Sequence, residues 1–139
     1  MKKSLQQRQE EFLSGTLKYY TKDVSRRCIK DGNCLYSPVN AGNPNSQGCA
    51  IGRWLKPELQ IELDKSLTSV CVDKTFQMLP TVLQNLSKSF LTACQNLHDG
   101  SDYWNDEGLT QAGKKKVDSI IEDYNLNPQK FIKWSTKNT

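Results

Sequence analysis

The most regular pattern in the sequence is a row of apolar side chains at helical spacing between residues 83 and 98. Residues three and four positions apart lie on one face of an α-helix. The row consists of Leu83, Leu86, Phe90, Leu91, Cys94, Leu97 and His98. Gly100 follows it, and glycine is common just beyond a helix end. The pattern therefore predicts an amphipathic helix that buries one face and ends before Gly100.

Four other segments also have the features of helices. Residues 4–22 are amphipathic, and Pro57, which suits the first position of a helix, precedes leucines spaced four apart. Thr110 can cap a helix with a buried apolar face, and Asn127-Pro128 begins a last short helix. These segments favour a mainly helical chain.

Two short apolar runs predict strands, at residues 33–37 and 48–52. Residues 37–48 are rich in Pro, Asn, Gly and Ser, which is the composition of a loop. We expect the strands to pair as a β-hairpin around this long loop. The hairpin should pack on helices, because an isolated two-stranded hairpin is only marginally stable in water. Residues 68–74 fit either a strand or a helix.

Together these elements predict an α+β fold: one mostly helical domain over residues 1–139, with four to five helices packed around a small β-hairpin. A chain of 139 residues is the size of a single domain. The polar residues 135–139 are expected to form a frayed tail.

Composition argues against several classes of protein. No run approaches the roughly 20 apolar residues of a membrane helix, and polar residues 6–11 interrupt any signal-peptide core. We therefore expect a cytoplasmic protein whose five cysteines stay reduced. The net charge of +4, from 19 basic and 15 acidic interspersed side chains, argues against a nucleic-acid partner, and the lack of an apolar span argues against a membrane. Homo-oligomerisation stays open.

The residue types of a zinc site are present in Cys28, Cys34, Cys49 and His98. Structural zinc ligands, however, usually come in pairs with two to four residues between them. Here five residues separate the first two cysteines, so we expect no metal and no cofactor. A second interpretation makes Cys49 a nucleophile, His98 its base and Asp99 the orienting acid. Neighbouring side chains on a helix point about 100° apart, which places Asp99 poorly for that role. His98 more simply satisfies a buried hydrogen bond.

Arginines and aromatic residues flank the predicted hairpin. Arginine binds phosphate through its planar fork, and aromatic rings stack on bases. The candidate ligand-binding residues are Arg26, Arg27, Tyr36, Asn40, Arg53, His98 and Trp104. We expect them to form a site for a small anionic, nucleotide-like ligand, with no catalytic residue. The competing interpretation is that the arginines are solvated and the aromatic residues belong to the core.

Three short motifs, in this order, resemble a widespread group of small phage and prophage proteins of unassigned activity. They are Gly32-x-Cys34-x-Tyr36, then Cys49-Ala50-Ile51-Gly52, then Leu97-His98-Asp99 with Trp104 soon after. One departure is the cysteine that precedes Gln95. The resemblance implies a phage accessory protein, of a kind that counters host defences by sequestering a nucleotide signal or by blocking a protein.

The leading hypothesis is thus a non-enzymatic counter-defence protein that sequesters a small anionic ligand. One alternative is an inhibitor that binds a host defence enzyme through exposed Tyr19, Tyr20, Trp54 and Trp134. The second alternative is a small Cys/His-dependent enzyme.

Overall fold

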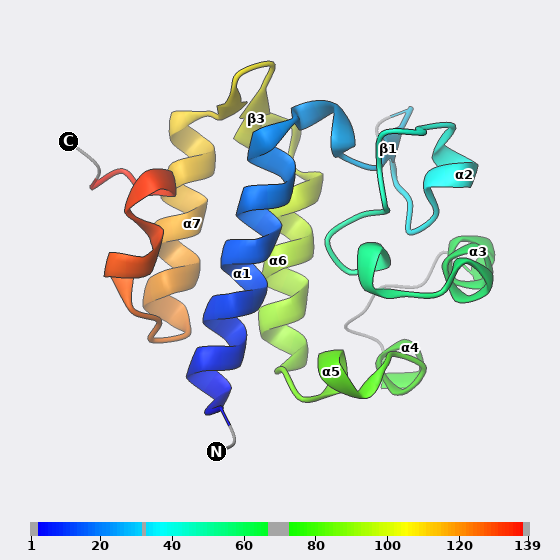
Figure 1. Ribbon diagram of the computed structural model, residues 1–139, viewed down its shortest axis with the longest axis horizontal. Coiled ribbons are helices and arrows are strands. Elements are labelled where there is room, and N and C mark those ends of the chain that lie inside the picture. The colour runs from blue at the N-terminus through cyan, green and yellow to red at the C-terminus, as the bar shows by residue number, and fades with distance from the viewer. Residues whose placement is uncertain (1–2, 32, 67–72, 138–139) are drawn as a thin grey trace.

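In the computed structural model, which describes residues 3–31, 33–66 and 73–137, three helices form a layer (Figure 1). They are α1 (Leu5–Lys22), α6 (Lys88–Asp99) and α7 (Gln111–Asp123). Helix α6 packs against both α1 and α7. A hydroxyl group caps the N-terminus of each helix by accepting a hydrogen bond from a backbone N–H of the first turn. The capping residues are Ser4, Ser87 and Thr110. The caps explain why each helix starts where it does.

The chain between α1 and α6 forms short elements that lie together beside this layer (Figure 1). They are the 3-10 helix η1 (Val24–Arg26), β1 (Ile29–Lys30), β2 (Asn33–Cys34), α2 (Pro38–Ala41), the 3-10 helix η2 (Gly52–Trp54), α3 (Pro57–Ser66), α4 (Asp73–Gln77) and α5 (Thr81–Gln84). Strands β1 and β2 are antiparallel, with Ile29 opposite Cys34.

A second antiparallel pair lies between α6 and α7. The 3-10 helix η3 (Ser101–Tyr103) leads into β3 (Trp104–Asn105), which pairs with β4 (Gly108–Leu109). The chain ends in the 3-10 helix η4 (Pro128–Trp134), which packs on α1 and α7. The mostly helical α+β domain is thus confirmed. Within the described residues, no helix combines the length and apolar character needed to cross a bilayer.

The core lies between the helices of the layer and continues toward the short elements on one side and toward η4 on the other. Its largest fully buried side chains include Tyr20, Phe90, Phe131, Leu13, Leu17, Ile51, Leu63, Leu83, Leu91, Leu97, Ile120 and His98. Residues from α1, α3, α6, α7, the 49–54 turn and η4 therefore share one hydrophobic cluster. Because the 49–54 segment contributes to this cluster, its position relative to α6 is set by packing as well as by hydrogen bonds.

The predicted hairpin between residues 33–37 and 48–52 is wrong. The Arg53 N–H donates to the Cys49 carbonyl and the Trp54 N–H to the Ile51 carbonyl, so the second run forms a turn and η2. Strand β2 pairs instead with residues 29–30. The segment 37–48 is correspondingly not a plain hairpin loop, because Ser37 caps α2 within it.

Two other boundaries differ from expectation. The row of apolar residues from 83 to 98 does not form one helix, because Ser87 caps α6 and leaves α5 as a separate turn. The predicted fraying is wrong for residues 135–137: Ser135 is buried, and the Thr136 hydroxyl donates to Asp118.

Two expectations concern residues that the structure does not describe. These are the end of the predicted tail, residues 138–139, and residues 68–72 of the segment that fits either a strand or a helix.

Gly52 and Gly48 allow two chain segments to touch. A Cβ atom at either position would overlap the Tyr36 carbonyl oxygen, and Gly48 also has a φ of 125°. The backbone at Tyr36 can therefore pack directly against the 48–52 turn only where side chains are absent.

A Gly52→Ala substitution should lower the free energy of unfolding by about 1–3 kcal/mol, since the methyl group meets backbone rather than a flexible side chain. Urea unfolding followed by circular dichroism measures this. Gly15→Ala is the matched control: its methyl group would have only an ordinary contact, 3.6 Å from Arg53. It should be neutral or stabilising, by up to about 1 kcal/mol. Equal losses in both variants would contradict the close approach at Tyr36.

Candidate functional site

His98, in the last turn of α6, is fully buried and uses both ring nitrogens. Its Nε2 atom accepts a hydrogen bond from the Cys28 N–H at 3.1 Å. The Nδ1 atom must then carry the proton, and it donates to Asp99 Oδ1 at 2.7 Å. The expectation that Asp99 is poorly placed to orient this ring is wrong. Gln95, one turn earlier, donates to the same carboxylate oxygen at 3.0 Å and holds it against the imidazole.

The buried environment keeps His98 neutral. Burial lowers the pKa of its imidazole, and although Asp99 acts in the opposite direction, the pKa stays below its ordinary value. The ring also packs edge-to-face on Tyr20, with 4.8 Å between ring centroids. A neutral imidazole with both nitrogens engaged joins α6 to β1 but has no free lone pair for proton transfer.

Two cysteines beside this ring, Cys28 and Cys34, have the character of protonated thiols. Cys34 Sγ accepts a hydrogen bond from Gln95 at 2.6 Å. The neighbouring Cys49 thiol, together with burial, raises the pKa of Cys34 far above its ordinary value. Burial raises the pKa of Cys28 to about 12. A nucleophilic cysteine needs a lowered thiol pKa, and these thiols show the reverse.

Cys34, His98 and Asp99 offer donor atoms that lie within 4.8 Å of one another. The donor set does not suit a cation, because the Nδ1 atom beside Asp99 carries a proton and the Nε2 lone pair faces the Cys28 N–H. Metallation at Nδ1 would place a proton on Nε2, directly against that backbone N–H. The arrangement is therefore a hydrogen-bonded junction between α6, β1 and β2.

Arg27 and Trp104 extend the junction. Arg27 Nε donates to the His98 carbonyl at 2.9 Å, and its guanidinium lies 5.5 Å from the Trp104 ring centroid. Trp104 is buried and donates to the Leu97 carbonyl. Both His98 and Trp104 pack on Tyr20. The structure thus brings three of the predicted site residues together, but the imidazole, the indole N–H and the Nε atom of Arg27 bind the protein itself.

Arg26 and Arg53 meet on a different ring, that of Tyr19. Their guanidinium carbons lie 4.8 and 5.8 Å from the Tyr19 ring centroid. Arg53 also lies 5.1 Å from the Trp54 ring centroid and donates to the Thr16 hydroxyl at 3.0 Å. Its Nε atom is buried and has no hydrogen-bond partner among the described residues. We call Tyr19, Arg26, Arg53 and Trp54 the arginine–tyrosine surface.

No described carboxylate lies within ion-pair distance of Arg26, Arg27 or Arg53. Partial burial lowers the pKa of Arg27 and Arg53, but an arginine remains charged at any physiological pH. The arginine–tyrosine surface differs from the junction at His98 in that two such guanidinium groups lie at one aromatic ring.

Tyr36 and Asn40, the two remaining predicted site residues, lie at Asp64 on α3. The carboxylate of Asp64 accepts hydrogen bonds from the Tyr36 and Ser37 N–H groups and from the Asn40 side chain. Tyr36 is buried, so its ring is not presented to a ligand. Both residues serve to attach the start of α2 to α3.

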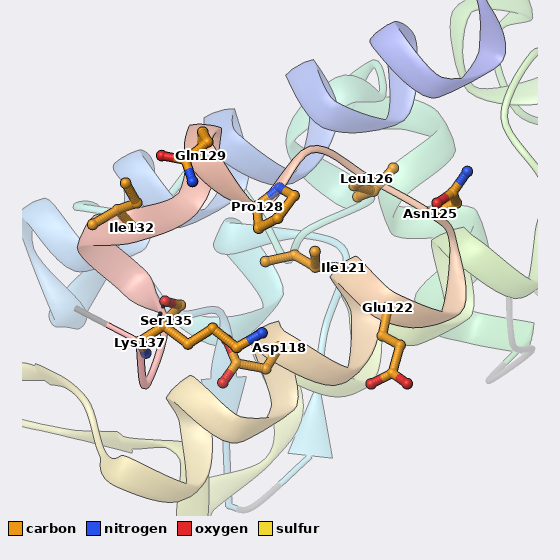
Figure 2. A pocket seen from close by; sticks show the side chains of 10 residues that line it. All are labelled: Asp118, Ile121, Glu122, Asn125, Leu126, Pro128, Gln129, Ile132, Ser135 and Lys137. Atoms are coloured by element: carbon orange, nitrogen blue, oxygen red, sulfur yellow. Dashed lines mark hydrogen bonds between the residues drawn. The ribbon is translucent and has the colours of Figure 1, made fainter.

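A hollow of about 650 Å³ is lined by none of the predicted residues. Figure 2 shows the side chains that line it. The hollow lies between α7 and η4. Its apolar lining includes Ile121, Pro128 and Ile132, and its acidic side chains are Asp118 and Glu122. Asp118 already binds Thr136. No sequence motif indicates this hollow, because its walls come from the outer side of α7 and from a segment that folds back on it.

Neither a protein-family model, nor a characterised protein, nor a solved structure matches this chain.

Because His98 is the only histidine, its protonation should be visible in the stability of the protein. The unfolded chain binds a proton there below the ordinary pKa of about 6.5, whereas the folded chain does so only at lower pH. The free energy of unfolding should therefore fall as the pH drops below about 6.5, by up to about 1.4 kcal/mol per pH unit.

Urea unfolding between pH 5 and 7.5 measures this slope. This pH range lies above the one in which most carboxylates titrate, so their contribution is small. A His98→Asn variant should be less stable at pH 7 and should lose the slope. A wild-type stability that is flat over this range, or a variant that keeps the slope, would contradict a neutral buried His98.

Proposed function

We propose that the protein is a non-enzymatic binding protein for a small anionic, nucleotide-like ligand, held at the arginine–tyrosine surface. One observation carries the proposal: Arg26 and Arg53 both lie over the Tyr19 ring, and neither forms an ion pair with a carboxylate of the described residues. Guanidinium groups that contact one aromatic ring and form no ion pair keep N–H donors for an anion with several oxygen atoms.

The aromatic part of the surface favours a ligand that also carries a base. Trp54 is 41% exposed, and the inner side of its ring is supported by Phe12, at a centroid distance of 6.0 Å. A rigid, exposed indole beside an arginine can stack on a planar base, while the guanidinium groups bind phosphate. A nucleotide combines both features.

Compared with the sequence-based set, the proposed site keeps Arg26 and Arg53 and adds Tyr19 and Trp54. Arg27, His98 and Trp104 would support it from the junction, and Tyr36 and Asn40 would have no contact with the ligand. The Cys/His-dependent enzyme has little support, because Cys49 is fully buried and His98 has no free nitrogen.

The resemblance of the three motifs to phage proteins supports a counter-defence role, exercised in the host cytoplasm. In that setting the protein would remove a nucleotide signal from solution by binding it. Sequestration needs affinity but no chemistry, which agrees with a site built from arginine and aromatic side chains.

Isothermal titration with ATP, a cyclic dinucleotide and pyrophosphate tests the proposal. We expect at least one nucleotide to bind more tightly than pyrophosphate, because the base adds stacking on Trp54. Arg26→Ala should weaken this binding about 10- to 100-fold, since a charge-assisted hydrogen bond contributes roughly 1.5–3 kcal/mol.

Lys115→Ala, which removes an exposed cation on α7, is the matched control and should leave the affinity unchanged. Absence of binding by all three probes would refute the proposal. Binding that Arg26→Ala and Lys115→Ala reduce equally would show a general effect of positive charge instead of a site.

A further inference from the structure

A small apolar slot lies next to the arginine–tyrosine surface, where α1, η2 and α5 meet. Its walls are Phe12, Trp54, Val82, Leu83 and Leu86, and it has a volume of about 110 Å³. The outer walls are open to solvent: Val82 is 51% exposed and Trp54 is 41% exposed. We call this feature the Trp54 slot. Apolar side chains gathered at the surface beside polar ones are typical of interaction sites.

The size of the slot restricts what can occupy it. Small-molecule sites usually measure roughly 300–1,000 Å³, whereas a cavity of about 150 Å³ holds a single benzene. At about 110 Å³, the Trp54 slot fits one leucine-sized side chain. The remainder of such an occupant must lie outside the slot, as the backbone of a bound peptide does.

The charge at the rim selects the chemistry of that peptide. Glu11 is neutralised by Lys3, at 2.7 Å. Arg8, the other charged residue of the lining, makes no ion pair within the described part of the chain. Arg8 donates to the Lys3 carbonyl, but its buried Nε atom has no partner in the part of the chain that the structure describes. The rim therefore carries an uncompensated positive charge beside an apolar slot.

We propose that the Trp54 slot docks a peptide segment of a partner protein, with one apolar side chain in the slot and an adjacent carboxylate on Arg8. This partner is distinct from the small ligand proposed above, although both contact Trp54. It also revises the sequence-based alternative of a protein-binding surface: Trp54 is exposed as expected, but Tyr20 and Trp134 are buried.

Selection from a random peptide display library on the purified protein tests the inference while the identity of the partner is open. The enriched peptides should share one leucine, isoleucine or phenylalanine next to aspartate or glutamate. Synthetic copies should bind the wild type and shift its tryptophan fluorescence, since Trp54 alone among the three tryptophans is exposed.

Two variants locate the binding. Arg8→Glu reverses the rim charge, and Val82→Arg obstructs the slot from an exposed position, so each should weaken the peptides about tenfold or more. Ile132→Arg, at a residue of similar exposure (43%) on η4, is the matched control and should have no effect. Thermal melts of all three variants establish that each remains folded.

Any of three results would overturn the inference. The first is a library that yields no enriched sequence, and the second is enriched peptides that bind Arg8→Glu and Val82→Arg as tightly as wild type. The third is free 4-methylpentanoate that binds as tightly as the peptides, which would identify a pocket for small carboxylates. Because Arg8 and Val82 lie outside the arginine–tyrosine surface, nucleotide binding by the same variants reports separately on the proposed function.

Discussion

The hydrogen bond from the Cys28 N–H to His98 Nε2 joins the two parts of the molecule, and the rest of the structure depends on it. Arg27 binds the carbonyl of the same histidine, so residues 26–30 are held to the end of α6. Gln95 adds bonds to Ile51 and Cys34. All the polar groups at this junction are buried or half-buried, where an unsatisfied partner would be costly. The junction thus sets the position of η1, which carries Arg26, and of the turn that carries Arg53.

The sequence predicts the helical part of this fold well and the remainder poorly. The residues of α1 and α7 have both a clear apolar face and a capping hydroxyl, so their limits follow from local chemistry. The run Cys49–Ile51 is apolar and completely buried, but it lies in a turn and not in a strand. Short apolar runs do not distinguish these cases, since the distinction depends on where the surrounding chain lies. The pairing of β1 with β2 is similarly decided by tertiary contacts of very short segments.

The candidate site, too, could be predicted from the sequence only in part. Residue type identified Arg26 and Arg53 as ligand-binding candidates, but not the ring on which they meet. Arg26 ends η1 and Arg27 begins extended backbone, so two consecutive arginines point to different aromatic residues, Tyr19 and Trp104. Tyr19 is not distinguished from Tyr20 by composition, yet one is half-buried beneath arginines and the other is fully buried in the core. Spacing along a chain does not contain this information.

Cys28, Cys34 and His98 thus belong to the architecture of the protein, whereas we propose that Arg26 and Arg53, which form no ion pair within the described residues, bind the ligand. The most direct test of that division is the side-chain ¹H–¹⁵N NMR spectrum of His98, which is the single histidine of the chain. At pH 7 we predict a neutral ring with its proton on Nδ1 and an unprotonated Nε2, unchanged when zinc is added. A charged imidazolium, a proton on Nε2, or a shift of either nitrogen on zinc addition would contradict this division and return the chemistry to the Cys34–His98 cluster.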